Sequence, residues 1–162
     1  MTAVSATGTY PAPIEDSFDF VTAEDVQPKV LHRYGPVPAV VRTVVLDGPE
    51  WDRSGCFREV HLDDGSMLHE QIDQLERPFT FSYDVTPQTG MLRHVIGSAR
   101  GEWEFAETND RTETTWTYRF RPRSSLLTPV VWVFSKVFQR YMQAAQERIS
   151  TQIAAAQTSA AR

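Results

Sequence analysis

The segment that follows Arg123 most constrains what this chain of 162 residues can fold into. Between about Ser124 and Ala154, apolar residues recur every three or four positions and polar residues fill the positions between them, which predicts an amphipathic α-helix. About 28 residues at 1.5 Å each make a rod roughly 42 Å long, enough to cross a sheet. Pro129 falls in the first turn, where proline is tolerated, and Thr128 is a candidate N-cap. The apolar stripe consists of Val130, Phe134, Val137, Phe138, Tyr141, Ala145, Ile149 and Ile153.

The middle of the chain supplies the layer against which this helix packs. Segments of alternating apolar and polar residues, separated by tight turns, predict an antiparallel meander rather than β-α-β units. The turn after the first strand contains Gly48 and Pro49, and Gly65 can take the positive φ that a primed hairpin turn requires. Gly97 and Gly101 predict bulges that bend the fifth strand. The expected strands are residues 40–47, 56–62, 67–74, 79–85, 91–106 and 113–121.

The amino-terminal part of the chain predicts less regular structure. Residues 1–9 are small and polar, and the pattern from Val4 to Tyr10 lacks clear apolar alternation, so we expect a loose arm or a weak edge strand. Residues 14–21 and 23–31 carry acidic residues early and apolar residues at helical spacing, which predicts two short helices. The fold class is therefore α+β, with a curved antiparallel sheet around a long final helix. Residues 155–162 are expected to fray.

Composition and charge exclude several classes of function. The formal net charge of −5 disfavours a sequence-independent grip on nucleic acid, so no nucleic-acid partner is expected. The single Cys56 cannot form an intrachain disulfide and no leader pattern opens the chain, which favours a cytoplasmic location. The longest apolar run, Leu126 to Phe134, is interrupted by Thr128 and Pro129 and is too short for a membrane span. We interpret it as the start of a core helix.

A family resemblance follows from the order of elements and from several local motifs. The motifs are Ala12-Pro13 with Phe18, the segment 55–60 that contains Gly55 and Arg58, Asp64-Gly65 with Glu70 on the next strand, and the segment 116–120 from Trp116 to Phe120. With these motifs, residues 13 to about 150 resemble the helix-grip fold of the START-like (SRPBCC) superfamily, and the bacterial polyketide cyclases within it most of all. The resemblance implies a START-like ligand-binding domain over residues 13–154, preceded by the arm of residues 1–12. It also implies a tunnel between sheet and helix that takes sterols, lipids, polyketides or phytohormones.

Two charged residues of adjacent strands are predicted to point into the interior. Arg58 is in phase with Val60 and Leu62, and Glu70 is in phase with Ile72. One interpretation is a buried structural ion pair, because a buried charge without a partner is costly. The other interpretation places both at the pocket wall, where they hold a carbonyl or hydroxyl group of a ligand.

Aromatic residues are the remaining candidates for the site. They either pack in the core or form the walls of a ligand pocket, with Glu70 or Tyr83 as the catalytic group if the protein is an enzyme. The candidate ligand-binding residues are Arg58, Glu70, Tyr83, Trp103, Trp116, Tyr118, Phe134, Phe138 and Tyr141.

The sequence carries no signature of metal or cofactor chemistry. Its four histidines and one cysteine do not have metal-ligand spacing, and His61 and His69 have the phase of the outer sheet face. No nucleophile elbow and no phosphate loop is present, so neither a metal nor a cofactor is expected.

Three functions remain open at this point. The first is binding of a hydrophobic small molecule in an internal cavity, by a monomer or homodimer. The second is a polyketide aromatase/cyclase or dehydratase that acts in the same cavity. The third is a protein-interaction module whose interior is filled by side chains.

Overall fold

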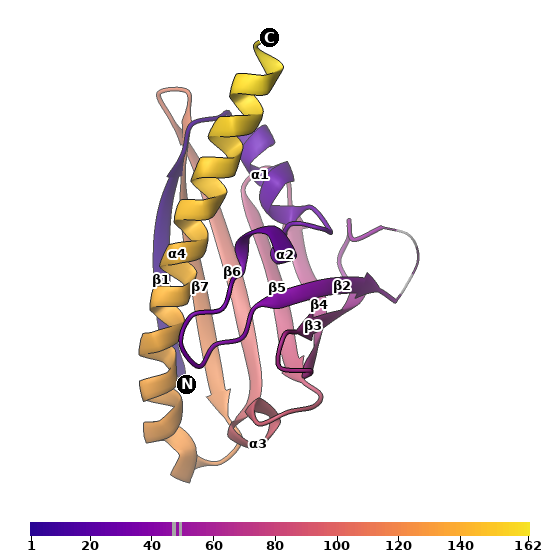
Figure 1. Ribbon diagram of the computed structural model, residues 1–162, viewed down its shortest axis with the longest axis vertical. Helices are drawn as coiled ribbons and strands as arrows, with labels where there is room; N and C mark the ends of the chain where they lie inside the picture. The colour runs from indigo at the N-terminus through magenta and orange to yellow at the C-terminus, as the bar shows by residue number, and fades with distance from the viewer. Residues whose placement is uncertain (47, 49) are drawn as a thin grey trace.

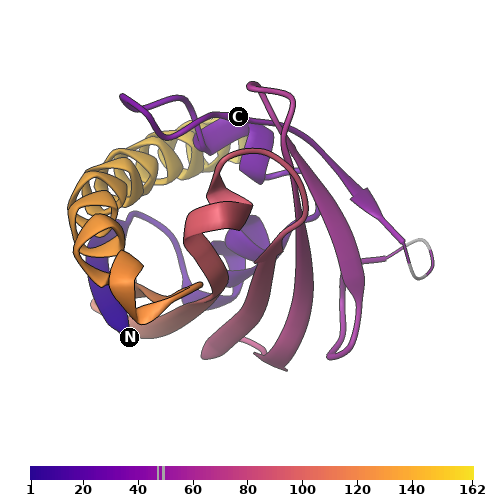
Figure 2. The ribbon, with the colours of Figure 1, turned by 90° about the horizontal axis from the view of Figure 1, so that it is seen from below.

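The computed structural model describes residues 1–46, 48 and 50–162 (Figure 1). These residues form one antiparallel seven-stranded sheet in the order β1-β7-β6-β5-β4-β3-β2, and the sheet curves around the long helix α4 (Figure 2). The strands are β1 (Thr2–Tyr10), β2 (Val40–Val45), β3 (Phe57–Leu62), β4 (Met67–Glu76), β5 (Thr80–Pro87), β6 (Ile96–Thr108) and β7 (Arg111–Pro122). The helices are α1 (Ile14–Thr22), α2 (Gln27–Val30), α3 (Leu92–Val95), the 3-10 turn η1 (Ser125–Leu127) and α4 (Thr128–Ala160). The α+β helix-grip fold is confirmed.

The amino-terminal segment is an edge strand and not a loose arm. β1 pairs with β7 over its whole length, from Thr2 opposite Phe120 to Tyr10 opposite Thr112. Inward-facing and outward-facing residues do alternate along β1, but the apolar pattern is weak in the sequence because some of the inward-facing residues are small. Position 8 has no room for a larger side chain, because a Cβ placed on Gly8 would lie 2.5 Å from Oε1 of Gln146 on α4.

Helix α4 is attached to β1 by polar side chains. Three of them donate hydrogen bonds to carbonyl groups of alternate β1 residues, which point to one edge of the strand. The donors and acceptors are Gln139 with Ser5, Gln143 with Thr7, and Ser150 with Thr9. The helix therefore covers an edge that could otherwise pair with another chain. Figure 1 shows that α4 runs along β1 and β7, so that it faces the other strands across the interior.

The ends of α4 differ from the prediction. Pro129 lies in the first turn as expected, but Leu127 is the N-cap residue and provides no side-chain hydrogen bond, so Thr128 is not the cap. The helix continues beyond Ala154 to Ala160, through much of the segment that was expected to fray. The interpretation of residues 126–134 as the start of a core helix is wrong for much of its length, because several of its large apolar side chains are exposed. These are Leu126, Val130, Trp132 and Val133.

The two glycines of the expected fifth strand have different roles. Residues 91–106 begin with the short helix α3, and only then continue as β6. The register between β6 and β7 shifts between Ile96 and Ser98, which confirms the bulge at Gly97. Gly101 instead pairs in regular register with Tyr83 on one side and Tyr118 on the other. Its bulge prediction is wrong, and its small size serves a close side-chain contact described below.

The short helices and turns close the interior around the sheet. α1 lies where it was predicted, and α2 is shorter than residues 23–31 and contacts both β2 and α4. The β3–β4 hairpin turns at Gly65 with a φ of 83°, as expected. The predicted end of the first strand at Asp47 and the turn at Pro49 lie outside the described residues.

Candidate functional site

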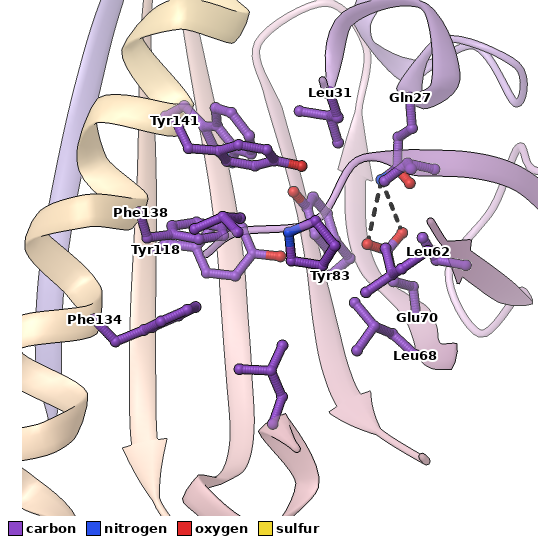
Figure 3. Close-up of a pocket in the computed structure, with 16 residues that line it drawn as sticks. Gln27, Leu31, Leu62, Leu68, Glu70, Tyr83, Tyr118, Phe134, Phe138 and Tyr141 are labelled. Atoms are coloured by element: carbon purple, nitrogen blue, oxygen red, sulfur yellow. Dashed lines mark hydrogen bonds between the residues drawn. The ribbon is translucent and has the colours of Figure 1, made fainter. Parts of the chain in front are cut away.

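The interior between α4, α2 and the curved sheet contains two adjoining cavities. The larger has a volume of about 60 Å³ and the smaller about 30 Å³. Four buried residues border both cavities and therefore lie between them, namely Gln27, Leu31, Tyr83 and Trp116. The larger cavity is further lined by Val37, Pro38, Val40, Val60, Leu62, Leu68, Glu70, Leu92, Tyr118, Phe134, Phe138 and Tyr141 (Figure 3).

Three tyrosines bring hydroxyl groups to the larger cavity. Tyr83 comes from β5, Tyr118 from β7 and Tyr141 from α4, and Figure 3 shows their oxygen atoms turned toward the middle of the site. The rings of Tyr83 and Tyr118 meet edge to face, with centroids 6.2 Å apart. Burial raises the pKa of each phenol above its ordinary value, and the nearby Glu70 charge raises it further. These groups are therefore neutral hydrogen-bond donors and acceptors at physiological pH.

One side of the larger cavity ends at a buried ion pair. Arg58 and Glu70 face each other across β3 and β4, which is the pairing that their strand phase predicts. Oε2 of Glu70 lies 2.7 Å from Nη2 of Arg58 and accepts a hydrogen bond of 2.8 Å from its Nε. Both side chains are 3–4% exposed. Such a pair is stable only when its remaining polar atoms are satisfied as well.

Gln27 completes the environment of Glu70. Its Nε2 donates to both carboxylate oxygens at 3.2 Å (Figure 3). Sequence reasoning missed this residue, although it lies three and four positions before the buried Val30 and Leu31 and therefore shares their helix face. A glutamine on the apolar face of a short helix was the signal that could have found it.

Each nitrogen of the Arg58 guanidinium has a polar partner in the protein. Besides Glu70, it donates from Nη1 to the carbonyl of Glu24 at 3.3 Å, and its Cζ lies 4.1 Å from the ring centroid of Trp51. It borders the smaller cavity only. The carboxylate of Glu70 is thus the member of the pair that reaches the larger cavity.

An aromatic wall joins the sheet to the helix. The indoles of Trp103 and Trp116 stack with centroids 4.6 Å apart, and the ring of Tyr118 packs against Phe138 of α4 at 4.8 Å. Offset or tilted pairs of this kind stabilise a core beyond their buried area. Trp103 borders only the smaller cavity, whereas Phe134 and Phe138 line the larger one.

The structure therefore brings the candidates from the sequence together around one interior. Those at the larger cavity are Glu70, Tyr83, Trp116, Tyr118, Phe134, Phe138 and Tyr141, while Arg58 and Trp103 are at the smaller one. Sequence reasoning missed most of the aliphatic lining, because an apolar residue of a strand looks the same whether it faces a cavity or packed atoms. The remaining space shows that side chains do not fill the interior completely.

The outer face of the sheet carries other polar groups. His61 and His69 lie there as their phase predicts, and Nε2 of His61 is 3.0 Å from Oε2 of Glu59. Within the described part of the chain, no three side chains of His, Cys, Asp or Glu gather as a metal site would require. None of the helices that the structure describes is both long enough and apolar enough to cross a membrane.

Comparison with known families agrees with this geometry. The profile of the family described as "Polyketide cyclase / dehydrase and lipid transport" matches residues 1–155. The chain belongs to this family. It is a member of the SRPBCC superfamily with the START-like fold that the sequence resembles, and the match includes the strand β1. A comparison with curated proteins gave no match.

Solved structures share the fold at low sequence identity. Ara h 8.0201 superposes with a TM-score of 0.71 at 15% identity, covering 95% of this chain and 98% of that chain. The Zhui aromatase/cyclase from a Streptomyces species gives a TM-score of 0.71 at 17% identity, covering 94% and 93%. The major latex-like protein 151 of Panax ginseng gives 0.66 at 12% identity, covering 93% and 96%. These likenesses establish the helix-grip architecture.

Proposed function

We propose that this family member binds a hydrophobic small molecule, lipid-like or polyketide-like, in the cavity between α4 and the sheet. The observation that carries the proposal is the lining of that cavity, in which aliphatic and aromatic side chains surround a few neutral hydroxyl groups and one paired carboxylate. Ligand pockets are built in this way, with apolar walls for affinity and few polar groups for orientation.

The size of the cavity sets a condition on the ligand. A volume of about 60 Å³ holds several water molecules, whereas pockets for drug-sized ligands measure roughly 300–1,000 Å³. A ligand of that size therefore requires side chains to move. The residues between the two cavities, Gln27 and Leu31 among them, are the ones whose displacement joins the existing spaces.

A neutral fluorescent dye, N-phenyl-1-naphthylamine, tests the proposal. We expect its emission to rise with saturation on addition of the protein, and we expect Val60→Phe to abolish the rise by filling the cavity, since Val60 is 1% exposed and lines it. Val41→Phe is the matched control, because Val41 is 56% exposed on β2. Dye binding that Val60→Phe leaves unchanged, or native mass spectra without co-purified ligand together with no dye binding, would contradict the proposal.

A second candidate is a polyketide aromatase/cyclase or dehydratase that acts in the same cavity. Its support is the family together with the juxtaposition of a carboxylate, Glu70, and neutral phenols, of which Tyr83 carries a proton it can donate. The engagement of Glu70 by Arg58 and Gln27 favours binding over base catalysis, because both carboxylate oxygens already accept hydrogen bonds from protein side chains. Incubation with poly-β-ketone analogues separates the two functions: a turnover that Glu70→Gln abolishes while dye binding survives supports the enzyme.

A further inference from the structure

Large apolar side chains gather on the outside of the molecule at the end where α3 and the start of α4 meet. Figure 2 is viewed from this end, with α3 and the start of α4 toward the viewer. The exposed fractions of these apolar side chains range from 51% to 87%. The residues are Met91, Leu126, Val130, Trp132 and Val133, and we call this set the apolar end face. Single exposed apolar residues are common, but a group of them at one place marks an interaction surface.

Hydrogen bonds hold the segments of the apolar end face together. Arg123, just before η1, donates from its backbone N to the carbonyl of Val95 at 2.9 Å and from Nη1 to the carbonyl of Arg93 at 3.2 Å. The carbonyls belong to α3, so the turn that leads into α4 is fixed against that helix. The face is therefore a property of the folded structure.

The charge around this face is opposite to the charge of the whole chain. The protein has a formal net charge of −5, yet residues 85–101 and 121–146 include no aspartate or glutamate. The exposed cations of α3, of α4, of the end of β7 and of the segment that follows it are Arg93, Arg121, Arg123, Lys136 and Arg140. On the neighbouring β3–β4 turn, Asp63 is paired with Arg33 at 2.6 Å. Asp64 accepts hydrogen bonds from Ser66 there. The segments that carry the apolar end face are thus basic in an acidic protein.

The mouth of the larger cavity opens at the same end. Most of its lining is buried, but Leu68, Leu92, Phe134 and Phe138 are only partly buried and mark where the cavity reaches the surface. Leu92 belongs to α3, and Phe134 lies one turn beyond Val130 on α4. Whatever covers the apolar end face therefore lies at the entrance to the cavity.

We propose that the apolar end face docks on the surface of an anionic lipid bilayer. Apolar side chains that enter the headgroup region, together with surrounding arginine and lysine, are the chemistry of peripheral membrane binding. Trp132 and Lys136 show both parts at once, since Nζ of Lys136 lies 5.6 Å from the centroid of the exposed indole. These side chains project from the end of a helix, and this convex shape fits the deformable surface of a lipid bilayer. Docking on the bilayer does not require an occupied cavity. Only the idea that docking lets a ligand pass between the bilayer and the cavity rests on the proposed function.

The tryptophans make this proposal directly measurable. Of the four in the sequence, Trp51, Trp103 and Trp116 are at most 5% exposed, whereas Trp132 is 54% exposed. We expect vesicles of equal parts phosphatidylcholine and phosphatidylglycerol to shift the emission to shorter wavelength, and brominated acyl chains to quench it. Vesicles of phosphatidylcholine alone bind far less, and added salt weakens binding to the anionic vesicles. The wild-type protein is used without added cavity ligand.

Variants separate the apolar from the electrostatic contribution. Leu126→Ser with Val133→Ser lowers vesicle affinity by at least about tenfold, because two apolar side chains no longer enter the interface. The matched control is Phe79→Ser, since Phe79 is 58% exposed at the other end of the sheet, two residues after Arg77, which pairs with Asp19 of α1. Lys136→Gln lowers the affinity about fivefold, the effect of one cation near an anionic surface, whereas Lys29→Gln on α2 leaves it unchanged.

Two results would overturn the proposal. One is emission that neither shifts nor is quenched by brominated anionic vesicles. The other is a dimer in sedimentation that the Leu126→Ser, Val133→Ser variant dissociates while vesicles fail to bind, which would assign the face to a second copy of the chain. Val60→Phe distinguishes this proposal from the proposed function, because it should abolish dye binding and leave vesicle binding intact.

Discussion

The ring of Tyr83 lies over the α-carbon of Gly101, its partner on the neighbouring strand β6. A Cβ placed on Gly101 would lie 2.6 Å from the Tyr83 hydroxyl oxygen and 2.7 Å from its Cε2. A glycine in the middle of a strand is unfavourable by about 0.5–1 kcal/mol relative to alanine. The packing of the Tyr83 ring against Gly101 compensates for this local loss of stability. Gly101 provides the space that keeps this ring between the two cavities.

Gly101→Ala is therefore expected to displace Tyr83. The added methyl group forces the ring out of its position, and overpacking of this kind costs about 1–3 kcal/mol of unfolding free energy. Urea unfolding measures the loss, and dye affinity should change with it because Tyr83 borders both cavities. Gly97→Ala is the control, since a Cβ there would meet its nearest atom, Cα of Arg123, at an ordinary 3.5 Å. Equal stability of the two variants would show that the ring is free to move.

The ion pair of Arg58 and Glu70 gives a second prediction. Glu70→Gln leaves a guanidinium that is 3% exposed without its counter-charge, so the free energy of unfolding should fall by about 3 kcal/mol. The triple variant Gln27→Leu, Arg58→Met, Glu70→Leu removes the three polar side chains together, leaves the Glu24 carbonyl its hydrogen bond from Thr43, and should recover most of that loss. Urea unfolding compares the two.

The same variants decide between the two interpretations of the pair. If the pair is structural, the triple variant binds the apolar dye as the wild type does. If Glu70 orients the ligand, the triple variant is stable but binds a hydroxylated ligand no better than its methyl analogue. A triple variant as unstable as Glu70→Gln would contradict the energetic argument.

The buried tyrosines predict the response to alkaline pH. Burial raises the pKa of Tyr10, Tyr83, Tyr118 and Tyr141 in the folded protein. Below about pH 10 these phenols are neutral in both states and contribute no pH dependence. Above it the unfolded chain ionises first, so stability falls by as much as about 1.4 kcal/mol per pH unit for each tyrosine.

Phenolate absorbance at 295 nm checks this directly. At pH 11 the folded protein should show less phenolate than its five tyrosines provide, and urea should release the rest. Tyr83→Phe should reduce the amount released by urea. Complete ionisation in the folded protein at pH 11 would contradict the burial of these rings. The raised pKa also keeps the Tyr83 hydroxyl protonated, so it can donate a hydrogen bond although it is a weaker acid than an exposed tyrosine.

The sequence was sufficient where a side chain's position follows from period alone. The phase of Arg58 with Val60, and of Glu70 with Ile72, correctly predicted that two opposite charges meet inside the sheet. The apolar stripe of the last helix likewise predicted that the buried Tyr141 faces the interior. Both inferences rest on the strand period of two and the helix period of 3.6.

Other features depend on contacts between distant segments and could not be predicted. β1 looked irregular because Gly8 makes room for the side chain of Gln146, which lies far away in the chain. The exposure of Trp132 was missed because an apolar run at a helix start reads as core unless its partner layer is known. The volume of the cavity could not be predicted either, because sequence periodicity does not distinguish residues that line a cavity from residues that fill the core.

Leu31 separates the two cavities, and its truncation should join them. Leu31→Ala removes a side chain that is 8% exposed and borders both spaces. We expect a loss of about 3 kcal/mol in unfolding free energy, together with an affinity for the naphthylamine dye that rises about tenfold as the joined cavity accepts it without rearrangement. Leu62→Ala is the matched control, because Leu62 borders only the larger cavity. It should cost similar stability and improve the affinity less. If both variants bind the dye equally well, the partition between the cavities does not limit ligand size, and the wild-type protein admits ligands by moving other side chains.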